Sequence, residues 1–132
     1  MSRIFIVDDS KIFRFTVVKL FSFSDFEGDL VEFESATELI NFLIENRNKP
    51  ELYPDLILLD INMPSKNGFE CLDELKKLGK PFSKFKVKIL SSSIDKEDIS
   101  RAEDFDQVEG FITKPLNPIL VLGIIQKLES VA

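Results

Sequence analysis

The sequence contains no histidine, no tryptophan and a single cysteine. Without histidine, the chain can carry no phosphohistidine, no serine–histidine pair and no histidine-ligated metal. Its one thiol, Cys71, cannot form an internal disulfide, which favours a reducing compartment, the cytoplasm. The N-terminal residues lack the apolar stretch of a signal peptide, and no run approaches the roughly 18 apolar residues that span a bilayer. Any chemistry is therefore expected from Asp, Glu, Lys and Ser side chains.

The composition is typical of a folded domain. Of the 132 residues, 44% are hydrophobic and 30% are charged, which fits one globular domain over residues 1–132 and argues against disorder. The formal net charge is −6, from 17 basic and 23 acidic residues, and no dense run of Lys or Arg occurs. We therefore expect neither nucleic acid nor a membrane among the partners of this chain.

Short apolar segments alternate with segments of helical spacing along the chain. The expected strands are residues 3–7, 30–34, 55–60, 86–90 and 109–113, and the expected helices are residues 11–23, 36–46, 68–78, 95–105 and 117–128. This alternation predicts an α/β fold, a doubly wound five-stranded parallel sheet with helices on both faces. In such folds the functional site lies beyond the carboxyl ends of the strands.

Polar and charged side chains follow four of these expected strands. Asp8 and Asp9 end the first strand, Asp60 ends the third, Ser91 the fourth, and Lys114 follows the fifth. Three carboxylates that meet on one rim repel one another unless a cation lies between them. One available cation is Lys114, and the other is a divalent metal. Because the ligands are all oxygens, Mg²⁺ or Mn²⁺ is favoured over Zn²⁺.

Asp60 is the expected nucleophile, because it directly follows a rigid central strand and carboxylates form acyl phosphates. In-line phosphoryl transfer needs neutralised charge on three equatorial oxygens, which a metal, an ammonium and a hydroxyl can supply. Each residue alone has an ordinary structural reading: a helix cap for Asp8 and Asp9, a turn for Asp60 and a solvated side chain for Lys114. Their joint occurrence, each at its own strand end, favours the functional interpretation.

Four motifs carry a resemblance to a known family: "IFIVDDSK", "DLILLDINMPSKNGFE", "ILSSS" and "GFITKPL". Together they resemble the receiver domains of two-component response regulators, in particular single-domain regulators of the chemotaxis type, from about Ser2 to Glu129. The resemblance implies a flavodoxin-like fold with strand order 2-1-3-4-5. Residues 129–132 leave no room for an output domain, so we expect a single receiver domain over residues 1–132.

The resemblance assigns roles to the acidic rim. It implies that Asp60 accepts phosphate from a partner phosphohistidine, and that Mg²⁺ is held by Asp9, Asp60 and the backbone carbonyl of Asn62. Asp8 lies close to the metal and acts through water. Lys114 pairs with the phosphoryl group. The chain would then not be a conventional enzyme, although it would catalyse its own phosphorylation and its slow dephosphorylation.

The resemblance also names a switch. Ser91 is the switch hydroxyl, where threonine is commoner, and Phe111 is the switch aromatic, where tyrosine is frequent. A phenylalanine can still turn inward but offers no hydroxyl for a hydrogen bond. Ser92 and Ser93 stand where residues tune access to the acceptor carboxylate. The peptide bond before Pro115 is expected to be cis, which aims the preceding lysine.

The implied partners are a sensor histidine kinase or a phosphotransfer protein, and a downstream protein that reads the face of the fourth helix, fifth strand and last helix. Two alternatives belong to other classes. One is an Mg²⁺-dependent phosphatase with an aspartyl nucleophile, whose nucleophile usually ends the first strand in a D-x-D pair beneath a cap domain. The other is a binding module that works without phosphorylation, which would lack an acid or the lysine.

The last expected helix is apolar nearly all round, which usually means burial on a second side. Its expected core face is Val121, Leu122, Ile124, Ile125 and Leu128. Ile119 and Leu120 then face solvent beside Gly123, which permits close approach of another chain. We expect this surface to form a homodimer contact that phosphorylation tightens; the alternative is that Ile119 and Leu120 only cover the fifth strand.

Overall fold

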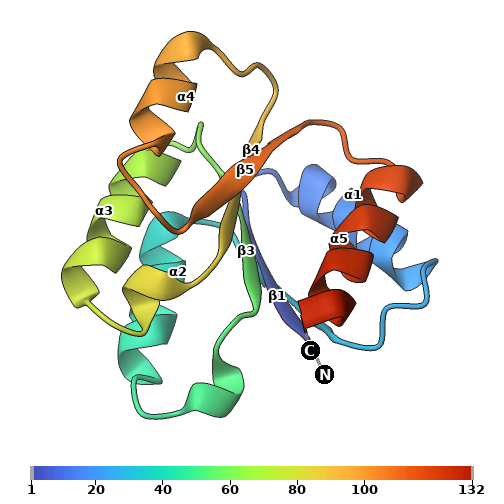
Figure 1. Cartoon of the computed structure of the whole chain (residues 1–132), viewed down its shortest axis with the longest axis horizontal. Helices are drawn as coiled ribbons and strands as arrows, with labels where there is room; N and C mark the ends of the chain where they lie inside the picture. Colours follow the sequence, from blue (N-terminus) through green and yellow to red (C-terminus); the bar gives the residue numbers. More distant parts are fainter. Residues whose placement is uncertain (1, 132) are drawn as a thin grey trace.

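The computed structural model describes residues 2–131 of the chain, which form alternating strands and helices (Figure 1). The strands are β1 (Arg3–Val7), β2 (Asp29–Phe33), β3 (Leu56–Asp60), β4 (Val87–Ser91) and β5 (Val108–Thr113). The α-helices are α1 (Lys11–Ser22), α2 (Ala36–Glu45), α3 (Gly68–Leu78), α4 (Lys96–Ala102) and α5 (Pro118–Val131). Two short 3₁₀ helices, η1 (Pro50–Leu52) and η2 (Phe82–Lys84), lie before β3 and β4.

The five strands form one parallel sheet in the order β2-β1-β3-β4-β5, which confirms the predicted fold class. Helices α1 and α5 cover one face of the sheet, and α2, α3 and α4 cover the other (Figure 1). The central strand β3 is buried along its whole length, as expected for a strand between two helical layers. All five strand ends therefore point toward the same rim of the sheet.

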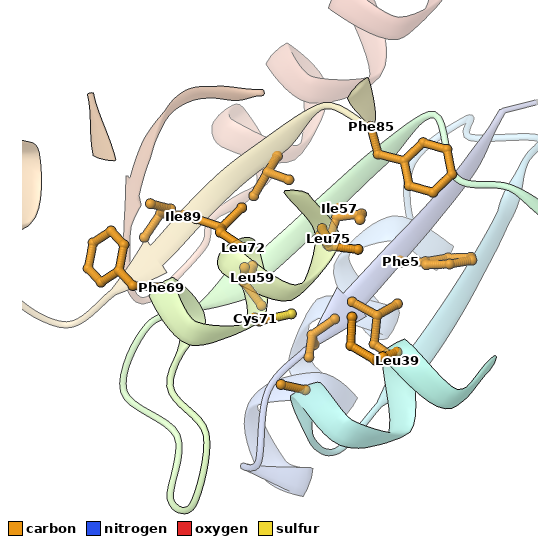
Figure 2. Close-up of a cluster of buried hydrophobic side chains, with 14 of the residues drawn as sticks. Phe5, Leu39, Ile57, Leu59, Phe69, Cys71, Leu72, Leu75, Phe85 and Ile89 are labelled. Atoms are coloured by element: carbon orange, nitrogen blue, oxygen red, sulfur yellow. The ribbon is translucent and has the colours of Figure 1, made fainter. Parts of the chain in front are cut away.

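Two apolar cores lie on the two faces of the sheet, because successive strand side chains point in opposite directions. Phe5 and Val7 belong to the core beneath α2 and α3, whereas Ile4 and Ile6 belong to the core beneath α1 and α5. Figure 2 shows the first core, in which Leu39, Leu72 and Leu75 of the helices meet Ile57, Leu59 and Ile89 of the strands. Cys71 lies in the same core, and burial raises the pKa of its thiol to about 12.

Polar caps fix where the helices begin. The hydroxyl of Ser35 accepts a hydrogen bond from the Glu38 backbone N–H and so caps α2. Asp95 caps α4 instead of belonging to it, and that helix ends at Ala102, so the expected helix over residues 95–105 is too long. The two 3₁₀ turns were not expected from the sequence either. Three residues make no periodic pattern, so such turns leave little signal.

Helix α5 buries a narrower face than its sequence predicts. Val121, Ile124 and Ile125 are buried, as expected. Leu122, however, is 52% exposed, so its assignment to the core face was wrong. It lies three residues after Ile119, and residues at that spacing share a helix face, so the two side chains point to solvent together. Among residues 2–131, no helix is long and apolar enough to cross a membrane.

Candidate functional site

The turn from β1 into α1 places two of the predicted acids. The backbone N–H of Asp8 donates to the carbonyl of Phe33, which continues the β1–β2 pairing to the rim. The Asp8 side chain is fully buried, and its Oδ1 accepts the Ser10 N–H at 2.9 Å. Asp9 is exposed. One carboxylate is thus fixed by the turn, while its neighbour faces solvent.

Asp60 ends the central strand, and only 3% of its surface is exposed. Its Oδ1 accepts the backbone N–H of Asn62 at 3.1 Å, a bond that fixes the side chain over the following turn. The first residue of α3, Gly68, packs directly against this strand end. A Cβ atom at Gly68 would lie 2.8 Å from the Asp60 carbonyl oxygen and 2.8 Å from the Cα of Ile61. Only glycine allows α3 to begin this close to the end of β3.

Lys114 reaches the acids from the loop after β5. Its backbone N–H donates to the carbonyl of Ser91, and the peptide bond between Lys114 and Pro115 is cis. The Nζ atom lies 2.7 Å from Oδ2 of Asp8 and 3.5 Å from Oδ2 of Asp60. The ammonium is therefore shared between the two buried carboxylates.

The acidic cluster has an unfavourable electrostatic balance. Asp8, Asp9 and Asp60 offer carboxylate oxygens that all lie within 4.8 Å of one another. Burial raises the pKa of Asp60, and the charges of Asp8 and Asp9 add to this effect. The Asn62 hydrogen bond and the Lys114 charge act in the opposite direction without cancelling the rise. A further cation at this cluster would relieve the repulsion.

The residues present fit a hard divalent cation. The donors are oxygens only, which suits Mg²⁺ or Mn²⁺. Oδ2 of Asp8 is buried and has no hydrogen bond of proper geometry within the described residues. Its 2.7 Å contact with the Lys114 ammonium is an ion pair by distance alone, so this oxygen retains acceptor capacity.

The two predicted switch residues lie on β4 and β5, the strands that follow β3 in the order of the sheet. Ser91 is buried at the end of β4, and its hydroxyl donates to the carbonyl of Ser93 at 2.6 Å and accepts the Ser93 N–H. Ser92 and Ser93 are exposed, and Phe111 is half-buried against the core beneath α2 and α3. In this arrangement the Ser91 hydroxyl makes its hydrogen bonds with the backbone of the loop that follows β4.

The sequence analysis did not assign two further residues, Arg14 and Phe13, to the site. The Arg14 guanidinium is buried, donates to the Asp8 carbonyl at 2.6 Å, and pairs with Glu32 of β2 through Nε at 3.1 Å. Its position was available as a signal, because Arg14 stands three residues before Val17 on the buried stripe of α1. The other missed residue is Phe13, whose ring centroid lies 4.4 Å from Nζ of Lys114.

A parallel sheet in this order, with an acidic cluster and a lysine at its carboxyl rim, defines the class of receiver-type α/β domains. The chain matches the family model of the response regulator receiver domain over residues 4–126. It therefore belongs to that family, as its motifs suggested, and is a receiver domain of two-component signalling.

Individual relatives agree with this assignment. The chain is 33% identical over 118 residues to the two-component response regulator ORR1 of Oryza sativa subsp. japonica, which covers 88% of this chain and 50% of that protein. The chain thus spans half the length of that relative. It is 29% identical over 130 residues to the response regulator Rcp1 of Synechocystis, which covers 96% of this chain and 86% of that protein.

Solved structures show the same fold. The two-component response regulator from Cytophaga hutchinsonii superposes with a TM-score of 0.85 at 29% identity, covering 98% of each chain. The Mn²⁺-bound form of response regulator Rcp1 superposes with a TM-score of 0.76 at 28% identity, covering 98% of this chain and 93% of that one.

Proposed function

We propose that the chain is a phosphoacceptor that takes its phosphoryl group on Asp60 from a histidine kinase or a phosphotransfer protein. The observation that carries the proposal is the position of this carboxylate, buried at the end of β3 with Lys114 Nζ at 3.5 Å and two further acids beside it. In the transfer, a carboxylate oxygen of Asp60 bonds to phosphorus as the P–N bond of the donor breaks. The donor imidazole leaves with the electron pair of that bond and takes up a proton.

Mg²⁺ or Mn²⁺ would be held by the carboxylates of Asp9 and Asp60 and by the backbone carbonyl of Asn62, with Asp8 acting through water. When bound, the ion supplies positive charge that neutralises the phosphoryl oxygens. The oxygen-only donor set and the spare acceptor capacity of Asp8 Oδ2 support this assignment. Arg14 helps to hold the same turn by donating to the Asp8 carbonyl.

Lys114 would pair with the new dianion, since its ammonium already lies between Asp8 and Asp60. Ser91 would leave its bond with Ser93 and turn its hydroxyl toward a phosphoryl oxygen. Phe111, now half-buried, would rotate into the space that this movement opens. The surface formed by α4, β5 and α5 then changes, and a partner that prefers one form is coupled to phosphorylation by about 1 to 3 kcal/mol.

The readout would be a downstream protein, or a second copy of this chain that contacts α5. Ile119 is 81% exposed and Leu120 is 37% exposed on that helix, and a Cβ at Gly123 would meet no atom within 4 Å. These exposures support the predicted apolar contact surface. They are equally compatible with a heterologous partner, which the oligomeric state of the phosphorylated form would distinguish.

The experiment that tests the acceptor is intact mass spectrometry after incubation with phosphoramidate and Mg²⁺. We expect one added phosphoryl group on the wild type and none after Asp60→Asn or in EDTA. The matched control is Asp106→Asn, which makes the same chemical change at an exposed acid and should be phosphorylated normally. Phosphate retained by Asp60→Asn would overturn the site assignment. Turnover of a small phosphomonoester would instead favour the phosphatase alternative.

A further inference from the structure

The ammonium of Lys114 has an aromatic neighbour that the proposed chemistry does not use. The ring of Phe13 lies with its centroid 4.4 Å from Nζ, well within the range of about 6 Å over which a ring face attracts a cation. The same Nζ contacts the carboxylates of Asp8 and Asp60. The lysine head group is therefore surrounded by two anions and one ring face.

The place of Phe13 in α1 gives the ring a fixed position. Its backbone N–H donates to the hydroxyl of Ser10, the residue that caps the helix. Its side chain is half-buried and packs at the edge of the core beneath α1 and α5. The ring is thus anchored from its own backbone and from the core, whereas Lys114 carries its charge on a flexible stem.

A neutral ring has a property that a third anion would lack. It attracts the ammonium without accepting any of its N–H donors in a conventional hydrogen bond, so all three remain available for carboxylate or phosphoryl oxygens. It also adds no negative charge to a cluster that already holds three acids. Such a contact can hold the lysine head group near Asp60 while leaving it free to bind an incoming dianion.

We propose that Phe13 is a positioning residue for Lys114, and that its ring holds the ammonium beside Asp60 for phosphoryl transfer. The inference rests on the proposed function of Asp60 as acceptor. Position 13 then influences the rate of phosphorylation although its side chain touches no reacting atom. Nζ of Lys114 lies 2.7 Å from Asp8 and 3.5 Å from Asp60 with the ring in contact, so the ring is one of the three groups that hold the head group within reach of Asp60.

The simpler reading is that Phe13 only completes the core, and side-chain truncation cannot separate the two. Fluorination can, because one to three fluorines on the ring keep its shape nearly constant while weakening the negative charge of its face. Mono-, di- and trifluorophenylalanine would be placed at position 13 by site-specific incorporation. The rate of Asp60 phosphorylation would be followed by intact mass across a range of phosphoramidate concentrations with Mg²⁺ in excess.

We expect the maximal rate to fall stepwise with each fluorine, by about threefold to thirtyfold over the series, which is the range that one cation–π contact covers. The matched control is the same series at Phe15, whose ring lies 5.5 Å from Lys19 Nζ on the exposed side of α1. It carries the same chemical change on a cation–π pair that faces solvent, and its rates should stay constant. Equal rates across the series at position 13 would overturn the proposal.

A second measurement tests the contact without any phosphate. In NMR spectra, the ring should shift the ε-methylene protons of Lys114 upfield, and Phe13→Leu should remove this shift. An unshifted signal in the wild type would also overturn the proposal. A wild type that takes up no phosphate at all would instead refute the function of Asp60, whereas a phosphorylated wild type with flat rates at position 13 would refute the role of Phe13 alone.

Discussion

Replacing Asp60 by asparagine should make the unphosphorylated protein more stable while removing its proposed function. The substitution keeps the shape of the side chain and a carbonyl oxygen that can accept the Asn62 N–H. It removes one of three clustered charges from a position that is 3% exposed. Lys114 does not lose its only partner, because its Nζ still lies 2.7 Å from Asp8. The Lys114 ammonium therefore stays compensated in the variant.

The magnitude follows from the distances. At an effective dielectric constant of about 20, the repulsion between Asp8 and Asp60, which lie within 4.8 Å, is at least about 3.5 kcal/mol, and the attraction of Lys114 at 3.5 Å is about 5 kcal/mol. Asp9 is exposed, so water reduces its repulsion to about 1 kcal/mol. These pairwise energies nearly cancel. What remains is the cost of burying the charge, and its removal should raise the free energy of unfolding by about 1 to 3 kcal/mol.

The increase in the free energy of unfolding caused by Asp60→Asn should depend on pH in a defined direction. The pKa of Asp60 is raised in the folded protein above its ordinary value of 3.8, chiefly by burial. The folded state therefore keeps this proton to a higher pH than the unfolded state, and wild-type stability falls as pH rises from 3.8 through the raised pKa. The advantage of Asp60→Asn should be complete at neutral pH and should vanish below pH 3.8, where both states are protonated.

Thermal unfolding of both proteins in EDTA, repeated at several pH values, measures this effect. For a domain of this size, the expected gain corresponds to an increase in Tm of about 3 to 10 °C at neutral pH. Asp106→Asn, at an exposed acid, should leave Tm unchanged. An Asp60→Asn variant that is no more stable than the wild type at neutral pH, or whose advantage grows in acid, would refute the reasoning.

Three further outcomes are expected. Lys114→Ala should stay folded and accept phosphate but leave the NMR signals of the Phe111 ring unmoved by beryllofluoride; a shift as large as that of the wild type would count against the switch. Leu72→Ala should lower the free energy of unfolding by about 2 to 5 kcal/mol in urea denaturation, because Leu72 is fully buried, whereas Leu122→Ala at a 52% exposed site should change it by less than about 0.5 kcal/mol. Beryllofluoride should dimerise the wild type but not Leu120→Glu in sedimentation equilibrium, and a wild type that stays monomeric would refute the dimer.

The parallel sheet was predictable because each strand is a short apolar run and each connection is a helix, which leaves few parallel arrangements. Its strand order was predicted from the resemblance to receiver domains, not from the apolar pattern. The acidic rim was predictable from the parallel arrangement, since the carboxyl ends of parallel strands meet at one edge. What the sequence could not supply is the direction of individual side chains. Leu122 is as apolar as its neighbours, and only its angular position around the axis of α5 makes it exposed. The contact between the Phe13 ring and Lys114 exists only in the folded chain, where the loop after β5 lies beside α1.

The length of the fourth helix could not be predicted either, because its polar residues give no apolar period to mark its end. Asp95 satisfies both readings, as a helical residue or as a cap, and the hydrogen bond that it accepts from the Asp98 N–H decides between them only in three dimensions. For Arg14 the position on the buried face of α1 was visible in the sequence, but its role was not. That role depends on the Asp8 carbonyl and Glu32, which only the fold brings beside the guanidinium.

The contact between Gly68 and the end of β3 distinguishes two kinds of substitution that would remove phosphorylation at Asp60. One kind leaves the fold intact, and the other disturbs it. Exchanging a rim acid for its amide alters charge while the surrounding backbone stays in place. Adding even one methyl group at position 68 instead pushes against the Asp60 carbonyl and the Ile61 backbone at 2.8 Å, so strand and helix must separate. Relatives that fold but cannot be phosphorylated should therefore differ at the acids or the lysine. A relative with another residue at position 68 should lose both phosphorylation and the packing of α3 against β3.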